Sequence, residues 1–319
     1  MSIVNAREIM LEAAEGKYAV GAFNITNLIQ MEAVVETAIA KKAPLIIQAS
    51  VTPSKFLGPK VIAAIYRTLA ESAPIPICLH LDHSTSVEFC KECADAGYTN
   101  LMIDASKQDY EENIRQTREV VDYCHSLGNL SVEGELGTVS GVEDQVIVAE
   151  DEAQLCSPEQ AVDFVERSGV DIFAPAIGTA HGVYKTKNPK VDFERLGKIN
   201  QILNGNGVKI PLVVHGGTGL SKEYAIKLVE MGGAKFNVST ELKYALIDSS
   251  YGYMTENRDQ YNPGKVDIVV KEAISKVVGR WIDVLGSAGK AKADLRPKTS
   301  DISFFAKVLG LLYRRIEND

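Results

Sequence analysis

Three of the five histidines in the chain stand at or just after the ends of short apolar segments. They are His83 in LHLDHS, His181 in AIGTAHG and His215 in LVVHGGTG. Three imidazoles with one open coordination position form the donor set of a catalytic zinc or a similar divalent ion. One such histidine alone would more often be structural, but three at matching positions favour a metal site. His80 and His125 are interpreted as structural, because His80 alternates away from His83 and His125 lies in a helical segment.

Carboxylates stand at the same kind of position. Asp82 precedes His83, Asp104 ends an apolar segment in MIDAS, and Glu133 and Glu135 lie in VEGEL. Residues two apart in a strand share a face, so both glutamates point the same way. A metal-bound histidine needs an acceptor for its second ring nitrogen, and Asp104 or a glutamate could provide it.

Glycine-rich turns near these residues expose backbone amides, at Gly178, Gly182, Gly216, Gly217 and Gly219. Further polar donors nearby are Lys185, Thr218, Ser239 and Thr240. Amides beside a helix N-terminus at the ends of the last strands are the usual phosphate site of (β/α)8 barrels. A metal facing such a site predicts a phosphorylated substrate with one oxygen directed at the metal.

Apolar segments alternate with helical ones along most of the chain. The apolar segments span residues 18–23, 45–49, 75–81, 100–103, 130–136, 170–177, 210–214 and 233–238. Strands that are apolar on both faces and alternate with helices indicate a parallel sheet. Eight such units predict a closed α/β fold, the (β/α)8 TIM barrel, whose active site forms at the C-terminal ends of the strands. An open doubly wound sheet is the alternative, but it usually carries GxGxxG after its first strand, where this chain reads GAFNI.

The composition narrows the possible partners and compartment. The 319 residues are 45% hydrophobic, which suffices for one large domain or two small ones. A net charge of −8 argues against nucleic acid or an anionic membrane as the main partner, although a local basic cluster could still bind an anionic small molecule. The N-terminus lacks the apolar core of a signal peptide, and no apolar run is long enough to span a bilayer. Five scattered cysteines do not suggest a disulfide framework, so we expect a reduced, cytoplasmic protein.

Two segments depart from the repeating pattern. Residues 137–158 form a long insertion rich in Gly, Ser, Glu and Asp, and a loop of this length is usually functional or disordered. Residues 1–291 are predicted to form the barrel domain, and residues 292–319 a linker and an amphipathic helix. That C-terminal extension is expected to dock on the barrel or on a partner subunit, with a membrane-surface helix as the alternative.

Together these segments resemble the class II, metal-dependent fructose-bisphosphate and tagatose-bisphosphate aldolase family. The resemblance rests on GAFNITN, LHLDHS, MIDAS, VEGELGTVSGVED, AIGTAHGVYK, VVHGGTGLS, NVSTELK and DVLGSAGKA, in this order from Gly21 to Ala291. It implies a barrel that reversibly cleaves a ketose 1,6-bisphosphate to dihydroxyacetone phosphate and an aldehyde such as glyceraldehyde 3-phosphate. It also implies Zn²⁺ or another divalent metal, a monovalent cation (Na⁺ or K⁺), and a homodimer or homotetramer.

The same resemblance implies roles for individual residues. The implied metal ligands are His83, His181, His215, Glu135 and Asp104, with Glu133 as a further candidate. Asp82 matches the catalytic acid/base, and Glu143 matches the residue that moves a proton at C1 or C3 of the bound fragment. The implied substrate- and phosphate-binding residues are Asn24, Ser50, Gly182, Lys185, Gly216, Thr218, Asn237, Ser239, Thr240 and Lys271. Gly182 and Gly216 also match the monovalent cation site.

The chain departs from the family pattern in ways that concern the sugar. Where members usually carry DPR..LGPGR, this chain reads NPGKVDIVVK, so the arginine that grips the far phosphate becomes Lys271. Lysine keeps the charge but loses the bidentate fork. Ser239 stands where fructose-type enzymes often carry Asp or Asn, and Ala180 stands where Ser is common. These changes favour a ketose phosphate other than, or besides, fructose 1,6-bisphosphate, including a monophosphate.

Two other classes of function compete with an aldolase. A zinc hydrolase on the same barrel would typically carry an HxH pair at the end of the first strand, where this chain has Phe23 and Asn24. A noncatalytic binding protein could keep the barrel, but the complete set of Asp82, three histidines and Glu143 argues against the loss of catalysis.

Overall fold

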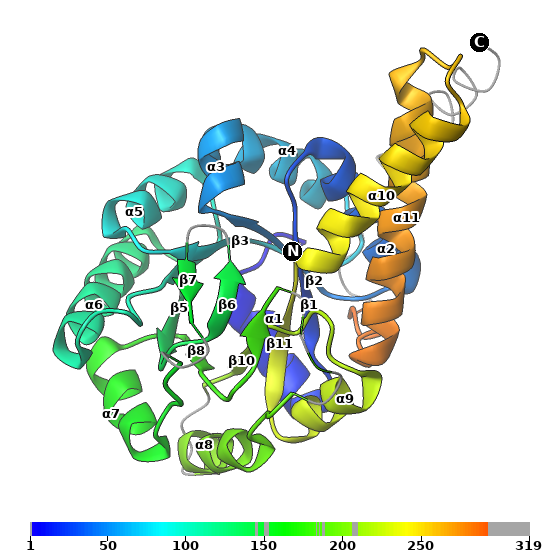
Figure 1. The fold of residues 1–319 in the computed structure, drawn as a ribbon. Coiled ribbons are helices and arrows are strands. Elements are labelled where there is room, and N and C mark those ends of the chain that lie inside the picture. The colour runs from blue at the N-terminus through cyan, green and yellow to red at the C-terminus, as the bar shows by residue number, and fades with distance from the viewer. Residues whose placement is uncertain are drawn as a thin grey trace.

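The computed structural model describes residues 2–143, 146–149, 153–182, 184, 186, 189–205 and 210–292, with the backbone alone at 142, 143 and 146–148. Eight parallel strands form its centre: β1 (Val20–Asn24), β2 (Leu45–Ser50), β3 (Ile77–Ser84), β4 (Asn100–Ile103), β5 (Ser131–Leu136), β8 (Ile172–Pro175), β10 (Leu212–Val214) and β11 (Gly233–Val238). They close into a barrel in the order β1, β11, β10, β8, β5, β4, β3 and β2 (Figure 1). Each strand overlaps one of the predicted apolar segments.

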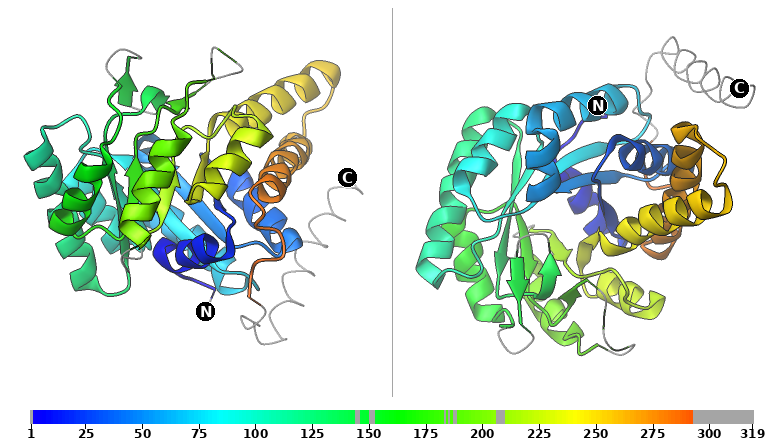
Figure 2. Two further views of the ribbon diagram at one scale, coloured as in Figure 1. Left: turned by 90° about the horizontal axis from the view of Figure 1, so that it is seen from below. Right: turned by 45° about the horizontal axis from the view of Figure 1, so that its top comes forward.

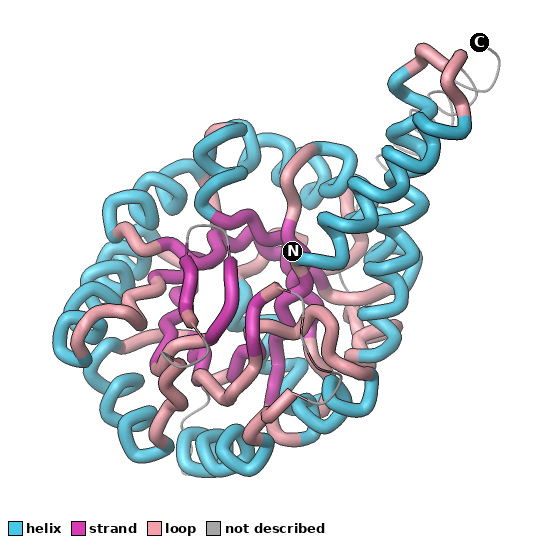
Figure 3. Tube along the Cα trace, viewed as in Figure 1, coloured by secondary structure: helices cyan, strands magenta, loops and turns pink. Residues whose placement is uncertain are grey.

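Helices follow every strand and surround the barrel (Figures 1 and 3). They are α2 (Leu28–Lys41), α3 (Val51–Leu57), α4 (Pro59–Glu71), α5 (Val87–Ala96), α6 (Tyr110–Leu127), α7 (Pro158–Ser168), α8 (Phe193–Gly205), α9 (Lys222–Glu230), α10 (Thr240–Glu256) and α11 (Pro263–Val284). The predicted (β/α)8 barrel is therefore confirmed. The outward faces of the strands and the inner faces of the helices are both apolar, which is why the strands carry continuous hydrophobic runs.

The N-terminal helix α1 (Ala6–Gly16) closes one end of the barrel. Its buried residues pack with the strand residues that point into the lower interior, including Ile46, Ile172 and Val213. This lower layer is apolar. The interior becomes polar further along the strands, at Gln48, His80 and the residues that follow them. The polar site therefore lies at the C-terminal ends of the strands, as a (β/α)8 barrel predicts.

The described C-terminal region is helical and projects from the barrel. Figures 1 and 2 show α10 and α11 side by side, extending beyond the ring of helices. Helix α11 also packs along α2, and Trp281 is buried against Phe236, with ring centroids 5.7 Å apart. The predicted linker and amphipathic helix over 292–319 lie outside the described residues after position 292.

The long insertion contains a hairpin that sequence periodicity does not indicate. Strands β6 (Ser140–Glu143) and β7 (Val146–Val148) pair antiparallel, and β6 pairs parallel with the short β9 (Ala180–His181). Gly141 is aligned with His181 in this second sheet. The insertion is thus joined by backbone hydrogen bonds to the segment that carries one of the predicted metal ligands.

None of the helices that the structure describes combines the length and the apolar character needed to cross a membrane.

The start of helix α6 allows a test of how much one capping side chain stabilises a helix. The side chain of Asp109 caps it by accepting a hydrogen bond from the backbone N–H of Glu112 (2.9 Å). An Asp109→Ala substitution removes this acceptor and leaves an amide at the helix start without its partner. We expect it to lower the free energy of unfolding by about 1 kcal/mol. Chemical denaturation checks this, and an unchanged midpoint would contradict it.

Candidate active site

Asp82 and His83 both reach the mouth of the barrel because the backbone breaks the strand alternation at His83. His80 and Asp82 are two apart in β3 and point inward together, so regular alternation would turn His83 outward. His83 instead has a left-handed φ of 47°, and the register between β3 and β4 shifts at this point. Such a conformation costs a non-glycine residue about 1–2 kcal/mol and is concentrated at functional sites.

The three predicted ligand histidines come together at this mouth. The ring centroid of His83 lies 4.8 Å from that of His181 and 4.5 Å from that of His215. One nitrogen from each of the three rings lies within 4.8 Å of the other two. His83 and His215 are buried and His181 is partly buried. Three nitrogen donors at this separation suit one divalent ion.

Two carboxylates orient the rings so that their free nitrogens face one another. His83 Nδ1–H donates to Asp104 Oδ2 (2.8 Å), and His215 Nε2–H donates to Glu133 Oε1 (3.0 Å). Because a carboxylate only accepts, these bonds place protons on His83 Nδ1 and His215 Nε2, and they direct His83 Nε2 and His215 Nδ1 toward each other. The two nitrogens are 3.0 Å apart, close to the separation of about 3.3 Å expected for two ligands of one tetrahedral zinc ion. Without an ion, His83 Nε2–H can donate to His215 Nδ1, and a divalent ion would replace this proton between the two nitrogens.

The electrostatics of the site also favour a cation. Glu135 Oε2 is buried and has no hydrogen-bond partner among the described residues. Burial and the neighbouring charge of Asp104 raise the pKa of Glu135 well above its usual value. Burial lowers the pKa of His83, but the charges of Asp82 and Asp104 outweigh it and raise that pKa overall. Glu135, Asp104 and His83 also form a second group whose donor atoms lie within 4.8 Å of one another.

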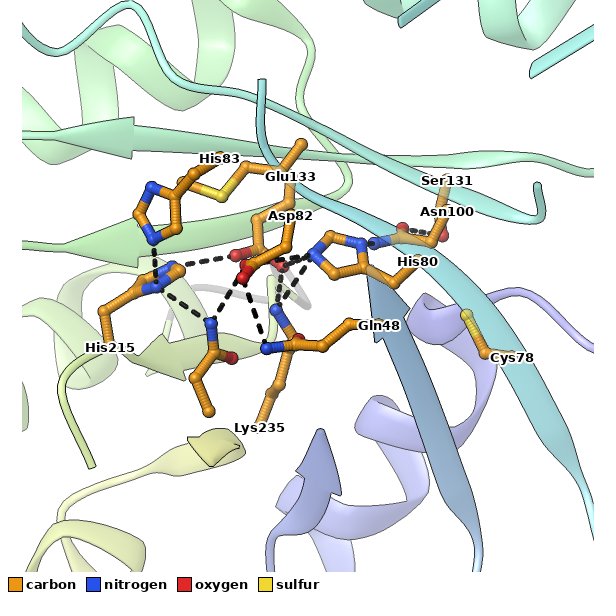
Figure 4. A network of polar contacts seen from close by, with 12 residues as sticks. Gln48, Cys78, His80, Asp82, His83, Asn100, Ser131, Glu133, His215 and Lys235 are labelled. Atoms are coloured by element: carbon orange, nitrogen blue, oxygen red, sulfur yellow. Dashed lines mark hydrogen bonds and ion pairs between the residues drawn. The ribbon is translucent and has the colours of Figure 1, made fainter. Parts of the chain in front are cut away.

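Asp82 is held as a buried carboxylate with its oxygens defined by side-chain amides. Asn24 Nδ2 donates to Oδ2 (3.0 Å) and Asn237 Nδ2 donates to Oδ1 (3.1 Å). Gln48 Nε2 lies 3.4 Å from Oδ2 (Figure 4). Burial raises the pKa of Asp82, but the charges of His83 and Lys235 outweigh burial and lower it overall. The group is therefore an ionised base with a fixed orientation.

The loops that carry His181 and His215 approach each other closely. Gly216 has a φ of 65°, and a Cβ at this position would lie 2.5 Å from the carbonyl oxygen of Ala180. The hydroxyl of Tyr184 joins the same two loops, because it accepts from the backbone N–H of Ala180 (2.9 Å) and donates to the carbonyl of Gly216 (2.7 Å). Burial raises the pKa of Tyr184 to about 12, so it stays a protonated donor.

Most of the predicted substrate-binding residues lie around this mouth. Thr218 Oγ1 accepts from the backbone N–H of Ser239 (3.1 Å), which ties the loop after β10 to the start of α10. Ser239 is the residue before α10 and Thr240 is its first residue. Ser50 ends β2 and is aligned with Asp82. Gly182 follows His181 with a φ of 86°.

The side chains of three predicted residues are either outside the described part of the structure or lie on another element. Lys185 lies outside the described residues, and Glu143 is described only by its backbone in β6. Lys271 lies on α11, where its Nζ donates to Glu36 (2.8 Å) and Glu32 (3.2 Å) of α2. Two carboxylates neutralise this lysine, so within the described chain it does not present a free charge to a phosphate. The phosphate-binding role of Lys271 stays a prediction, and a site shared between subunits would require at least a dimer.

Some residues of the site were not predicted from the sequence. Gln48 and Lys235 are polar residues inside apolar strands, and Lys235 lies two positions before Asn237, so period-two alternation was the available signal. Tyr184 carries no such signal, since its partners are backbone groups of two loops. His80 lies beneath the site, in contact with Lys235, and His125 bonds Asp171 at the outer surface (2.8 Å).

The fold and the donor set thus fit a (β/α)8 enzyme of the metal-assisted class, with a buried carboxylate beside three converging histidines. Comparison with known proteins agrees. The family model for class-II fructose-bisphosphate aldolase matches residues 4–290, and the chain belongs to this family, whose members are metal-dependent lyases.

Individual relatives cover nearly the whole chain. A fructose-bisphosphate aldolase of Geobacillus stearothermophilus is 38% identical over 91% of this chain and 99% of its own length. One from Staphylococcus aureus is 37% identical, over 92% of this chain and 100% of its own. Among solved structures, the YdjI aldolase of Escherichia coli K12 aligns with a TM-score of 0.78 at 32% identity, over 91% of this chain and 100% of its own. A putative fructose-1,6-biphosphate aldolase of Coccidioides immitis aligns with a TM-score of 0.81 at 31% identity, covering 90% and 97%.

The Tyr184 hydroxyl gives a sharp test of loop positioning. Tyr184→Phe removes two hydrogen bonds, each of which contributes about 1 kcal/mol to stability. Because these bonds hold the loops of His181 and His215 together, we expect the affinity for a divalent ion to fall about tenfold. Competition with a chromophoric chelator measures this. Tyr66→Phe is the matched control, because its hydroxyl also donates to a backbone carbonyl, that of Ile77 (2.8 Å), at the opposite end of β3. Equal affinities for the two variants would contradict the expectation.

Proposed function

We propose that this chain is a metal-dependent ketose-phosphate aldolase that reversibly cleaves a fructose- or tagatose-type ketose 1,6-bisphosphate. The products are dihydroxyacetone phosphate and an aldehyde such as glyceraldehyde 3-phosphate. The observation that carries the proposal is the ionised, amide-held Asp82 beside three converging histidines. Membership of the aldolase family and relatives named fructose-bisphosphate aldolase support the same substrate class.

We infer that His83, His181 and His215 hold the divalent ion, with zinc as the leading candidate. Glu135 is a further or alternative ligand, since its buried Oε2 has no hydrogen-bond partner among the described residues. Asp104 fits better as the group that orients His83, because one oxygen accepts from His83 and the other from Ser106. When bound, the ion supplies a Lewis acid that polarises the substrate carbonyl and stabilises the negative charge left by carbon–carbon cleavage.

Asp82 is proposed to be the catalytic base. It takes the proton of the C4 hydroxyl as the C3–C4 bond breaks, and returns it in the condensation direction. The amides of Asn24 and Asn237 hold the carboxylate in one orientation for this transfer. Glu143 is proposed to move the proton at C1 or C3 of the three-carbon fragment. Its backbone lies in β6, which pairs with β9, the strand that contains His181, and this pairing supports the proposal.

The phosphate of the dihydroxyacetone phosphate end is assigned to the loops at one side of the mouth. The residues proposed for it are Gly182, Lys185, Gly216, Thr218, Asn237, Ser239 and Thr240. The N-terminus of α10 supports this assignment, because its first amides and its partial positive charge suit an anion. Ser239 Oγ has no hydrogen-bond partner among the described residues and is available as a donor. A monovalent cation is proposed beside Gly182 and Gly216, and Asn24 and Ser50 are proposed to steady the rest of the sugar.

A ketose monophosphate is a second candidate substrate. The specific observation is that Lys271, the one residue expected to replace the arginine for the far phosphate, is neutralised by Glu32 and Glu36. Without that charge the site retains less attraction for a second phosphate.

We further propose a cytoplasmic enzyme that assembles as a homodimer or homotetramer. Helix α10 exposes Tyr244, Ile247, Tyr251 and Met254, all at least half exposed. Their spacing of three, four and three residues forms one stripe, as in a helix-pairing seam. Two antiparallel copies of α10 would pair Tyr244 with Met254 and Ile247 with Tyr251, so the stripe is complementary to itself, as a two-fold interface requires.

Release of dihydroxyacetone phosphate from a substrate panel tests the catalytic proposal. The panel is fructose 1,6-bisphosphate, tagatose 1,6-bisphosphate and their 1-phosphates, with and without EDTA. We expect chelator-sensitive release that zinc, cobalt or manganese restores, and a fall of about 10²–10⁴-fold in kcat for Asp82→Asn. Release that EDTA leaves unchanged would contradict the metal dependence. Faster cleavage of the 1-phosphates than of the bisphosphates would select the monophosphate candidate.

Light scattering coupled to gel filtration tests the assembly. Ile247→Glu places a charge in the stripe, so we expect the variant to elute with a smaller mass than the wild type. Ile226→Glu is the matched control, because Ile226 is an exposed isoleucine on α9 outside the stripe. A monomeric wild type, or a variant with the wild-type mass, would refute an interface through α10.

A further inference from the structure

Lys235 on β11 is a buried charge to which the proposed reaction gives no role beyond its electrostatic effect on Asp82. It is fully buried in the barrel interior, where its Nζ donates to Glu133 Oε2 (2.8 Å) and to His80 Nε2 (3.2 Å). Figure 4 shows the side chain extending upward into the group formed by Glu133 and His80. An ammonium group removed from water is strongly unfavourable unless it is paired, so its presence here requires a physical reason.

The requirement for a folded barrel does not supply that reason. The interior layer just below is filled by Ile46, Ile172, Val213 and other apolar side chains, without any ion pair. Exchange of a buried ion pair for apolar residues of similar volume is often neutral or stabilising. A lysine–glutamate pair in the next layer therefore points to a constraint imposed by the site above it.

Glu133 connects this pair to the proposed metal site. One carboxylate oxygen, Oε2, accepts from Lys235, and the other, Oε1, accepts from His215 Nε2–H (3.0 Å). The bond from Lys235 fixes the rotation of the carboxylate, and the remaining oxygen can then hold only the protonated Nε2 of His215. The opposite nitrogen, His215 Nδ1, then carries no proton, so its lone pair is available to a metal ion. It lies 3.0 Å from His83 Nε2.

We propose that Lys235 is a positioning residue: by anchoring Glu133 it fixes the tautomer and orientation of His215, and so sets metal affinity and turnover without touching the substrate. The proposal rests on the proposed role of His215 as a metal ligand. It assigns the polar layer beneath the mouth to the support of a ligand, since groups that hold a metal-bound histidine commonly alter metal affinity 10–100-fold.

The first experiment compares Lys235→Met with Ile46→Ala in the intact chain. Both change the barrel interior and lower stability, but Ile46 lies in the apolar layer and its side chain cannot hydrogen-bond to Glu133. Zinc affinity is measured by competition with a chromophoric chelator at a temperature where both variants are folded. We expect Lys235→Met to bind zinc at least tenfold more weakly than Ile46→Ala. Equal affinities would overturn the proposal.

The double variant Lys235→Met/Glu133→Gln separates positioning from charge balance. It removes both charges and restores neutrality, so its melting temperature should recover from that of Lys235→Met. A glutamine can present either its oxygen or its amino group to His215, so the tautomer remains unfixed. We expect zinc affinity and kcat to stay low in the double variant. Recovery of affinity together with stability would mean that Lys235 only balances the charge of Glu133, which would overturn the proposal.

Nitrogen-15 spectra of the histidine rings give a signature that a merely structural role would not change. The metal-free wild type should show His215 as the Nε2–H tautomer, and Lys235→Met should show a mixture. An unchanged tautomer in Lys235→Met would refute the proposal. His215→Ala serves as the reference for the underlying function: if this substitution leaves zinc affinity intact, the proposed metal role of His215 fails independently of Lys235.

Discussion

The arrangement of the mouth depends on one electrostatic constraint, namely that every charge placed inside the barrel must be paired there. The carboxylates of Asp82, Asp104 and Glu133 lie within a structure whose lower interior and outer strand faces are apolar. Hydrogen bonds from side-chain amides, imidazoles and one ammonium group offset the free energy of burying these charges. Each of these bonds also restricts the rotamer of the carboxylate. The same interactions that make the charges tolerable therefore make the site rigid, which is what preorganised catalysis requires.

Backbone geometry adds a second level of control at the rim. Three features carry it: the left-handed turn at His83, the close approach of Gly216 to Ala180, and the hairpin β6–β7 paired with β9. None of them adds a side chain to the reaction. Each determines where an imidazole can lie, so the loops act as part of the frame rather than as flexible connections between strands.

The strands and the histidines could be predicted from the sequence because both follow simple rules. Apolar runs bounded by helices mark parallel strands, and residues at the C-terminal ends of parallel strands share one edge. Asn237 and Glu135 follow from the same rule. The orientation of His83 could not be predicted, because strand parity assigns it to the opposite face from Asp82 and only the backbone dihedral reverses this. Lys235 has the correct parity, but a lysine in a strand more often indicates an edge or an exposed face. The neutralised state of Lys271 depends on α2, far away in sequence, and no local pattern reports it.

The distribution of the histidines along the chain has a consequence for folding. His83 and His215 are 132 residues apart, and β3 and β10 are joined only through the other strands of the closed barrel. Contacts of such long range form after loop closure has been completed. An ion bound by these rings would therefore have no equivalent site in a partly assembled chain, and would stabilise the closed barrel over every incomplete intermediate. The metal would therefore complete the last long-range contact of the fold. Its loss would lower the barrier to separating β3 from β10 as the barrel opens.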